Sequence, residues 1–272
     1  MTAEINNGRA TVSVYTDSFN KRVRIDHYTG DRDEVLMIIK QQIPNWVEKL
    51  IVKSRTEDLT FFISKGFSCE SFIKGYYSGT DMYFVTQYFS ASRQQSEKLP
   101  TEKRIIQELI SEKYQPYEMT LEGIKIASIS DADRLALFYS EIFKVYPTPL
   151  GDVSHIRKTI TEGTIYAFIE IEDKLVSSAS AEVNKQFNNA ELTDCATLKQ
   201  AEGKGHMKRL LSYLHQKLTE EGTTCCYSIA RAESFSMNKA FAQLGYTYGG
   251  IMVNNCIIFS GLEDMNVWYK SQ

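Results

Sequence analysis

The stretch Gln200-Ala201-Glu202-Gly203-Lys204-Gly205-His206-Met207 stands between a predicted strand, residues 190–197, and a predicted amphipathic helix. The helix has Met207 and four leucines on one side, and Gly222 ends it. Glycines at a helix start expose several main-chain N–H groups with no side chain in the way, and the helix dipole adds positive potential. The stretch therefore predicts a pyrophosphate site, with Lys204 adding charge at its rim. A plain glycine-rich turn into a helix remains the alternative.

This glycine pattern differs from the two common nucleotide-binding loops. It lacks the G-K-[ST] ending of a P-loop, and it lacks the third glycine of G-x-G-x-x-G. The pattern gains weight from its surroundings, because strand, loop, helix, strand, helix and a Gly-aromatic pair follow one another here.

Outward from this stretch, the sequence alternates strands and helices. Strands are predicted at 124–128, 165–171, 175–183, 190–197 and 224–230, and helices at 130–143, 155–161, 206–221 and 234–244. Glu172-Asp173-Lys174 joins two of the strands as a hairpin turn. The order predicts an α+β fold with a mixed, mostly antiparallel sheet flanked by helices.

Two polar stretches divide the 272 residues. Residues 90–103 are predicted to form a loop or linker, and Ile105, Ile106, Leu109 and Ile110 then show helical spacing. A second polar break, 114–122, places a domain boundary near 120. We therefore expect an N-terminal α+β domain at 1–120 and a second domain at 121–272.

The first half repeats part of the order of the second. A strand at 50–53 and a short helix at 58–64 lead to Lys65-Gly66-Phe67, and Leu244-Gly245-Tyr246 holds the same place later in the chain. This predicts that the N-terminal domain is a truncated, degenerate copy. The copy is expected to reject phosphate, because Gly30-Asp31-Arg32-Asp33-Glu34 puts carboxylates at the positive end of its helix.

Composition excludes several classes of protein. A net charge of -3 and a pI near 5.9 give no basic excess for nucleic acid or an anionic membrane. Residues 1–10 lack the apolar run of a secretory signal, and no apolar run is long enough to span a bilayer. The five cysteines are odd in number and none forms C-x-x-C, which predicts reduced thiols in a cytoplasmic protein without a metal. A homodimer is compatible with the strand-rich C-terminal end.

The order Q-x-x-G-x-G after a strand resembles the acetyl-CoA loop of the GNAT N-acetyltransferase superfamily. The segment Asn238–Tyr246 is similar to the later helix of that superfamily, which flanks the pantetheine arm. The resemblance covers about residues 121–272 and implies acetyl-CoA as cosubstrate. The residues that it implies for the coenzyme are Cys195, Ala196, Thr197, Gly203, Lys204, Gly205, His206, Met207 and Asn238.

Further motifs resemble the β-lysine N-acetyltransferases. They are Tyr146-Pro147-Thr148-Pro149 with Asp152, Ala190-Glu191-Leu192-Thr193-Asp194, Ile229-Ala230-Arg231-Ala232, Val253-Asn254-Asn255 and Met265-Asn266-Val267-Trp268-Tyr269-Lys270. That family acetylates the ε-amine of β-lysine to give a compatible solute. The resemblance implies a small-molecule amine as substrate, with Tyr146, Asp152, Arg231, Asn254 and Asn255 as candidate contacts.

Amine acetylation needs a neutral amine and a polarised thioester held close together. Glu191 and Asp194 are the candidate catalytic carboxylates, as base or ammonium anchor, and their odd spacing predicts that they point to opposite faces of the strand. In the fold implied, a main-chain N–H near Cys195 or Ala196 would bind the oxyanion.

Two residues depart from the superfamily pattern. Glu202 stands where an Arg is usual, and Phe241 stands where many members carry a Tyr that protonates the leaving thiolate. These departures keep two alternatives open, namely an acetyltransferase for another small amine or a peptide, and a non-catalytic acyl-CoA-binding module.

Overall fold

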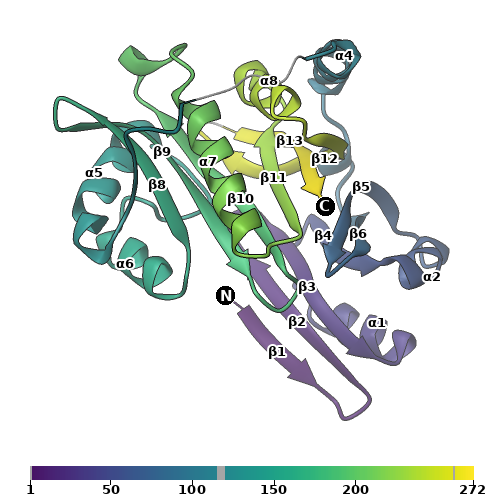
Figure 1. Cartoon of the computed structure of the whole chain (residues 1–272). Helices are drawn as coiled ribbons and strands as arrows, with labels where there is room; N and C mark the ends of the chain where they lie inside the picture. Colours follow the sequence, from purple (N-terminus) through teal and green to yellow (C-terminus); the bar gives the residue numbers. More distant parts are fainter. Residues whose placement is uncertain (1, 115–119, 260) are drawn as a thin grey trace.

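The computed structural model describes residues 2–114, 120–259 and 261–272, and within them thirteen strands form one sheet in the order β1-β2-β3-β4-β6-β5-β12-β13-β11-β10-β9-β8-β7 (Figure 1). The strands are β1 (Thr2–Asn6), β2 (Ala10–Asp17), β3 (Arg22–Gly30), β4 (Lys49–Arg55), β5 (Ser68–Tyr77), β6 (Thr80–Tyr88), β7 (Ile124–Ile126), β8 (Ile165–Ile171), β9 (Lys174–Asn184), β10 (Asn189–Thr197), β11 (Cys225–Arg231), β12 (Thr247–Ile258) and β13 (Gly261–Ser271). The helices are α1 (Arg32–Gln41), α2 (Leu59–Ser64), α3 (Ala91–Gln94), α4 (Leu99–Ser111), α5 (Ala132–Ile142), α6 (Val153–Thr161), α7 (His206–Glu220) and α8 (Phe235–Gln243).

The two halves of the sheet repeat one strand order. The first half runs β1-β2-β3-β4-β6-β5, and the second runs β8-β9-β10-β11-β13-β12. In each half the third and fourth strands are parallel and their neighbours antiparallel. Helix α1 follows its strand as α7 does, and α2 follows as α8 does. The prediction of an α+β fold with a mixed, mostly antiparallel sheet is confirmed, and the repeated strand order supports the prediction that the N-terminal half is a truncated copy.

The halves meet where β5 lies beside β12. The ladder there includes the pair Ser71–Gly250, and the backbones approach closely. A Cβ added at Gly249 would lie 2.2 Å from the Phe72 carbonyl oxygen, and one at Gly250 would lie 2.6 Å from the Glu70 carbonyl oxygen. These two glycines therefore allow the copies to share one sheet.

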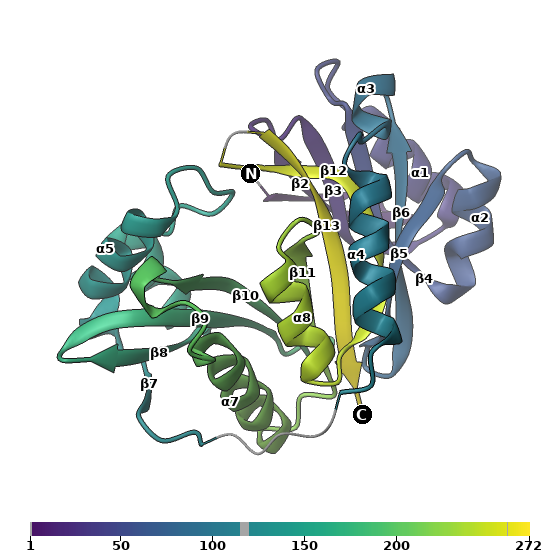
Figure 2. The ribbon, with the colours of Figure 1, turned by 90° about the horizontal axis from the view of Figure 1, so that it is seen from above.

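Helices cover the strands of the second half on both faces, with α5 and α7 on opposite sides of β8, β9 and β10 (Figure 2). Leu210, Leu211, Leu214 and Leu218 of α7 are fully buried in the core of this half. A second core lies under α1, and a third joins β4, β5 and β6 to β11, β12 and β13. The third core is shared by both halves, so the halves are packed together as well as paired.

Most predicted elements of the second half are present within a few residues of their expected ends. The loop predicted at 90–103 is wrong in part, because α3 occupies Ala91–Gln94 and α4 already begins at Leu99. Pro100 stands in the first turn of α4, where its missing N–H costs nothing. The break at 114–122 lies largely outside the described residues.

All five cysteines are free thiols in the structure. Among the described residues, the helices are too short or too polar to cross a membrane.

Candidate active site

Strands β10 and β11 separate after a short parallel ladder. They pair only from Asn189–Cys225 to Glu191–Tyr227, and beyond that point residues 193–197 and 228–231 line a cavity of about 640 Å³. We call this cavity the β10–β11 cleft. Because the strands diverge, main-chain groups on the facing edges lose their ladder partners and become available to a ligand. The start of α7 and one side of α8 complete the walls.

The glycine-rich loop opens into this cleft. Gly203 and Gly205 have φ of 74° and 77°, a left-handed conformation that other residues adopt at a cost, and both line the cleft. Gly205 is the N-cap residue of α7 and provides no side-chain hydrogen bond to the first turn of that helix. Its first N–H groups and the positive end of its dipole therefore face the cleft, as an anion site requires.

A β-bulge places Asp194 in the cleft. The register of β10 against β9 shifts between Thr193 and Ala196, and Asp194 has a φ of 51°. The bulge interrupts the regular alternation of side chains along β10. Asp194 lines this cleft, whereas Glu191 lines a second cavity, so only one of the two candidate carboxylates faces the cleft.

The Asp194 carboxyl is buried and held by a hydroxyl. The Ser180 Oγ donates a hydrogen bond of 2.7 Å to Asp194 Oδ2. Burial raises the pKa of Asp194 to about 6, with a contribution from the charge of Glu191, while hydrogen bonds from Ser180 and Tyr146 oppose the rise. A carboxyl with this pKa is ionised at neutral pH and can accept a proton.

Tyr146 lies beside that carboxyl. Its ring stacks on Phe143, with centroids 4.2 Å apart, and it lines the cleft. Burial and the Asp194 charge raise the pKa of the Tyr146 phenol well above its usual value. The phenol therefore stays protonated and serves as a hydrogen-bond donor.

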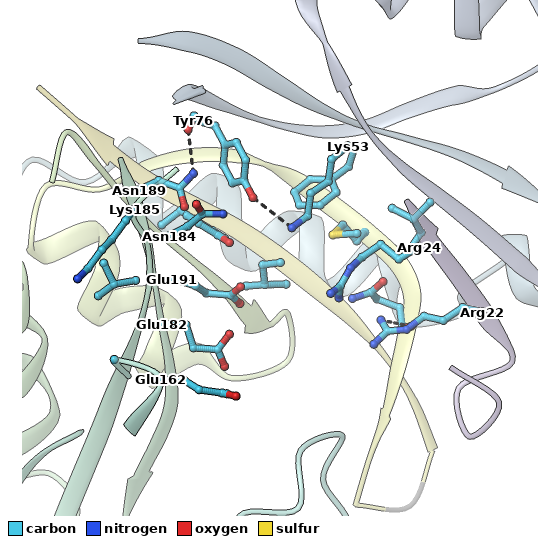
Figure 3. A pocket seen from close by; sticks show the side chains of 18 residues that line it. Arg22, Arg24, Lys53, Tyr76, Glu162, Glu182, Asn184, Lys185, Asn189 and Glu191 are labelled. Atoms are coloured by element: carbon cyan, nitrogen blue, oxygen red, sulfur yellow. Dashed lines mark hydrogen bonds between the residues drawn. The ribbon is translucent and has the colours of Figure 1, made fainter. Parts of the chain in front are cut away.

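A second cavity, of about 560 Å³, lies between the two halves, and we call it the junction cavity (Figure 3). Glu182 of β9 and Glu191 of β10 are directly opposite in the ladder on its C-terminal side. Burial, with the Glu182 charge, raises the pKa of Glu191 to about 7, although Lys53 and Arg24 lower it. Burial and the Asp194 charge also raise the pKa of Glu182. Ile229 lines both cavities.

The structure brings most of the predicted coenzyme residues together. Those that line the β10–β11 cleft are Cys195, Ala196, Thr197, Gly203, Gly205, His206 and Met207. Lys204 is exposed on the loop and does not line the cleft. Asn238 is fully buried, where it donates to the Arg231 and Ser234 carbonyl oxygens and accepts from Asn266 and Trp268.

The predicted substrate contacts are dispersed. Tyr146 and Arg231 line the β10–β11 cleft, and Asn255 lines the junction cavity. Asp152 caps α6 by accepting from the Ser154 N–H and lines neither cavity. The Asn254 amide donates to main-chain oxygens of the α3 segment and lines neither cavity.

Both departures from the superfamily pattern have clear positions. Phe241 is fully buried between Trp268 and Tyr246 and does not line the cleft. Glu202 is exposed at the rim of the cleft. Cleft residues from α8 were not predicted, among them Phe235, Met237 and Lys239. The apolar residues of this helix have the spacing of an ordinary amphipathic helix, which does not distinguish a ligand-binding face from a core face.

The residues that the first half contributes to the junction cavity were not predicted either. They include Arg22, Arg24, Lys53 and Tyr76. The signal in the sequence was the alternation of Arg22 and Arg24 with Val23 and Ile25 in β3. The apolar residues face the core, so the two arginines share the other face of the strand, where they need partners of opposite charge. Among the residues that the structure describes, no group of three or more His, Cys, Asp or Glu side chains is arranged to hold a metal ion.

A family profile described as "Acetyltransferase (GNAT) family" matches residues 132–246. N-acetyltransferase YodP of Bacillus subtilis is 33% identical over 273 residues, which is 99% of each chain. A beta-lysine N(6)-acetyltransferase of Methanosarcina mazei is 35% identical over 228 residues, 75% of this chain and 84% of the relative. A protein of the same name from Methanococcus maripaludis is 33% identical and covers 82% of both chains.

Proposed function

The chain belongs to the GNAT family of acetyl-CoA-dependent N-acetyltransferases, and from that premise we propose that it acetylates the ε-amine of a small amino acid. We propose β-lysine as the acceptor and N-ε-acetyl-β-lysine, a compatible solute, as the product. The names of two relatives that cover most of the chain support this choice. We propose the cytoplasm as its location.

The observation that carries the proposal is the meeting of two features in the β10–β11 cleft. The start of α7, whose N-cap Gly205 has no side chain, offers main-chain N–H groups to a diphosphate, and the buried carboxyl of Asp194 lines the same cleft. Acetyl-CoA supplies the reactive thioester, and the protein supplies placement and electrostatics. Lys208 and Met207 of the first turn line the same cleft.

In the proposed mechanism, Asp194 is the general base. A lysine-like ammonium has a pKa of about 10.4 and is protonated at neutral pH. A proton must therefore leave before the nitrogen can attack the thioester carbonyl. The nitrogen then forms a bond to the thioester carbon and releases its second proton to solvent, the C–S bond breaks, and CoA leaves as the thiolate. Tyr146 positions Asp194 through its hydroxyl. Phe241 cannot donate a proton and lies in the core.

The β-bulge leaves main-chain N–H groups that can bind the oxyanion. Because β10 has lost β11 as a partner and its register against β9 shifts at Asp194, the N–H groups near Cys195 and Ala196 lie where the ladder is interrupted. We propose that one of them donates to the carbonyl oxygen as charge develops there.

The test is a panel of amines with acetyl-CoA, in which free thiol is measured and the product is identified by mass. We expect N-ε-acetyl-β-lysine to form with the highest kcat/KM. Acetylation of another amine without β-lysine turnover would overturn the proposed acceptor. Coenzyme binding without turnover of any amine or peptide would favour the non-catalytic module.

We also propose that residues 1–120 and 121–272 are two domains that act as one unit. Each half has a core of its own, and the third core and the β5–β12 contact join them. Expression of 121–272 alone should give an aggregating protein, because β12 would present an uncovered edge. A soluble and active fragment would argue against this unit.

A further inference from the structure

The first half places cations in the wall of the junction cavity. Arg24 contacts Asp26 through two nitrogens, at 2.6 and 3.1 Å, and Lys53 Nζ lies 3.1 Å from the same carboxylate. Lys53 also donates to the Tyr76 hydroxyl at 3.1 Å. Two cations thus share one carboxylate, and this wall keeps an excess of positive charge.

The second half places carboxyl groups in the facing wall. Glu182 and Glu191 are cross-strand neighbours, where like charges repel. Figure 3 shows them on one side of the cavity, with Arg24 and Lys53 on the other. Lys185 also lines the cavity on this side, but the carboxyl groups of Glu162, Glu182 and Glu191 outnumber it. The two walls therefore have opposite net charge, as the two charged groups of a zwitterion would require.

A buried amide oxygen lies in the same cavity. Asn255 is 5% exposed and lines the cavity, and its Oδ1 has no hydrogen-bond partner among the residues that the structure describes. A buried amide oxygen without a partner is costly, so this oxygen is available to a hydrogen-bond donor, such as the amino group of a ligand or a water molecule. This observation is independent of the charged residues.

We propose that the junction cavity binds the amino-acid end of the acceptor, and that the N-terminal copy supplies the recognition of its carboxylate through Arg24 and Lys53. Glu182 and Glu191 bind the amino group nearest that carboxylate. The distal amine reaches Asp194 in the β10–β11 cleft. This inference rests on the proposed function, because it assumes an amine acceptor that meets the thioester there.

The spacing of the two carboxyl sites fits such an acceptor. Glu191 and Asp194 are three residues apart on β10, or about 10 Å at ~3.3 Å per residue, somewhat less across a bulge. That span suits two carboxyl groups that each hydrogen-bond one of the two amino groups of the same extended diamino acid. Ile229 lines both cavities, so the aliphatic part of the acceptor would pass it.

The experiment compares amino acids with the amines obtained by removing their carboxylate. The pairs are β-lysine with 1,4-diaminopentane, and lysine with 1,5-diaminopentane. For each pair, kcat/KM is measured in the full chain and in Arg24→Gln and Lys53→Gln. Arg9→Gln is the matched control, since Arg9 pairs with Glu34 on the exposed surface of the same half.

We expect the wild type to prefer the amino acid of the pair that it uses. Arg24→Gln should raise KM for the amino acid about 10- to 100-fold, the usual effect of losing a charge-assisted hydrogen bond. It should leave kcat/KM for the decarboxylated amine nearly unchanged, which a loss of folding would not do. Lys53→Gln should change KM in the same direction, and Arg9→Gln should leave kcat/KM for both substrates unchanged.

Two results would overturn the inference while leaving acetyl transfer intact. One is a wild type that prefers the decarboxylated amine in both pairs. The other is an equal fall in kcat/KM for both substrates of a pair in the Arg24→Gln and Lys53→Gln variants. A wild type that uses lysine but not β-lysine would instead reject the proposed acceptor and keep the carboxylate site.

Discussion

Helices α1 and α7 hold the same place in the two halves, yet their first turns differ in what occupies them. The Asp31 side chain accepts from the N–H groups of Asp33 and Glu34, so the positive end of α1 is already filled by a carboxylate. Helix α7 starts at Gly205 with no capping side chain and opens into the β10–β11 cleft. The repeated fold therefore does not repeat the free helix start, because the Asp31 side chain fills the first turn of α1.

The gaps between the parallel strands differ in the same way. The β3–β4 ladder ends at Ile25–Val52, and the next residues, Asp26 and Lys53, form an ion pair across the gap. The corresponding gap between β10 and β11 is open and forms the cleft. In the N-terminal copy this ion pair closes the gap, and its Lys53 also lines the junction cavity.

The largest expected effect separates the catalytic half from its copy. Asp194→Asn should lower kcat about 10²- to 10⁴-fold, the range typical of a lost general base, with little change in the Kd for CoA. In the wild type, kcat/KM should fall as the pH drops through about 6, because protonated Asp194 cannot accept a proton. Steady-state kinetics from pH 5 to 9 would check both statements.

Asp31→Asn is the control in the copy, and it should keep wild-type kcat. If Asp194→Asn retained full activity while Glu191→Gln lost it, the base would belong to the junction cavity, and the division of roles between the two cavities would be wrong.

Replacing the glycines at the two helix starts should affect different properties of the protein. Gly205→Ala meets no protein atom within 4 Å of the new Cβ and carries only the left-handed backbone strain, about 1–2 kcal/mol. We expect the Kd for CoA to rise about 10-fold, because the strained loop turns its N–H groups away. Gly30→Ala would put a Cβ 2.2 Å from the Arg9 carbonyl oxygen, and it should lower Tm instead.

Calorimetric titration with CoA and a thermal melt of both variants would test this pair. The comparison between the halves fails if Gly30→Ala weakens CoA binding as much as Gly205→Ala does.

The position of the coenzyme site followed from local pattern, while the acceptor side did not. The glycine loop, the α7 leucines and the β8–β9 hairpin are local signals, and all three elements are present. The bulge at Asp194 depends on a positive φ that alternation of side chains does not encode. Arg24 and Glu191 are far apart in sequence and meet at one cavity only because both halves share a sheet.

Asn238 illustrates the same limit within a correctly predicted helix. Its place on α8 fits the resemblance, but its amide hydrogen-bonds to five partners in the core. Which face of a short helix is buried depends on the strands beneath it, here β11 and β13, and a single sequence leaves that choice open.

The burial of Asp194 also predicts how stability depends on pH. Its folded pKa, about 6, lies above the ordinary value of 3.8, so the folded protein retains a proton that the unfolded chain releases between these values. This group therefore lowers the free energy of unfolding as the pH rises from about 4 to about 6. Asparagine does not titrate, so Asp194→Asn should gain stability relative to the wild type over that range. Urea unfolding at pH 4.5 and pH 7.5 would reveal a constant difference if the idea is wrong.

The smallest expected effect concerns the cap that closes the copy. Asp31→Ala removes the acceptor for the N–H groups of Asp33 and Glu34, which should cost about 1 kcal/mol and lower Tm by about 2–4 °C. It should not create a coenzyme site, because Glu34, paired with Arg9 and Asn7, still stands in the first turn of α1. Titration should therefore give one CoA per chain before and after the substitution. A second equivalent of CoA in Asp31→Ala would mean that the cap alone separates the two halves, and that the Asp26–Lys53 closure of the β3–β4 gap is dispensable.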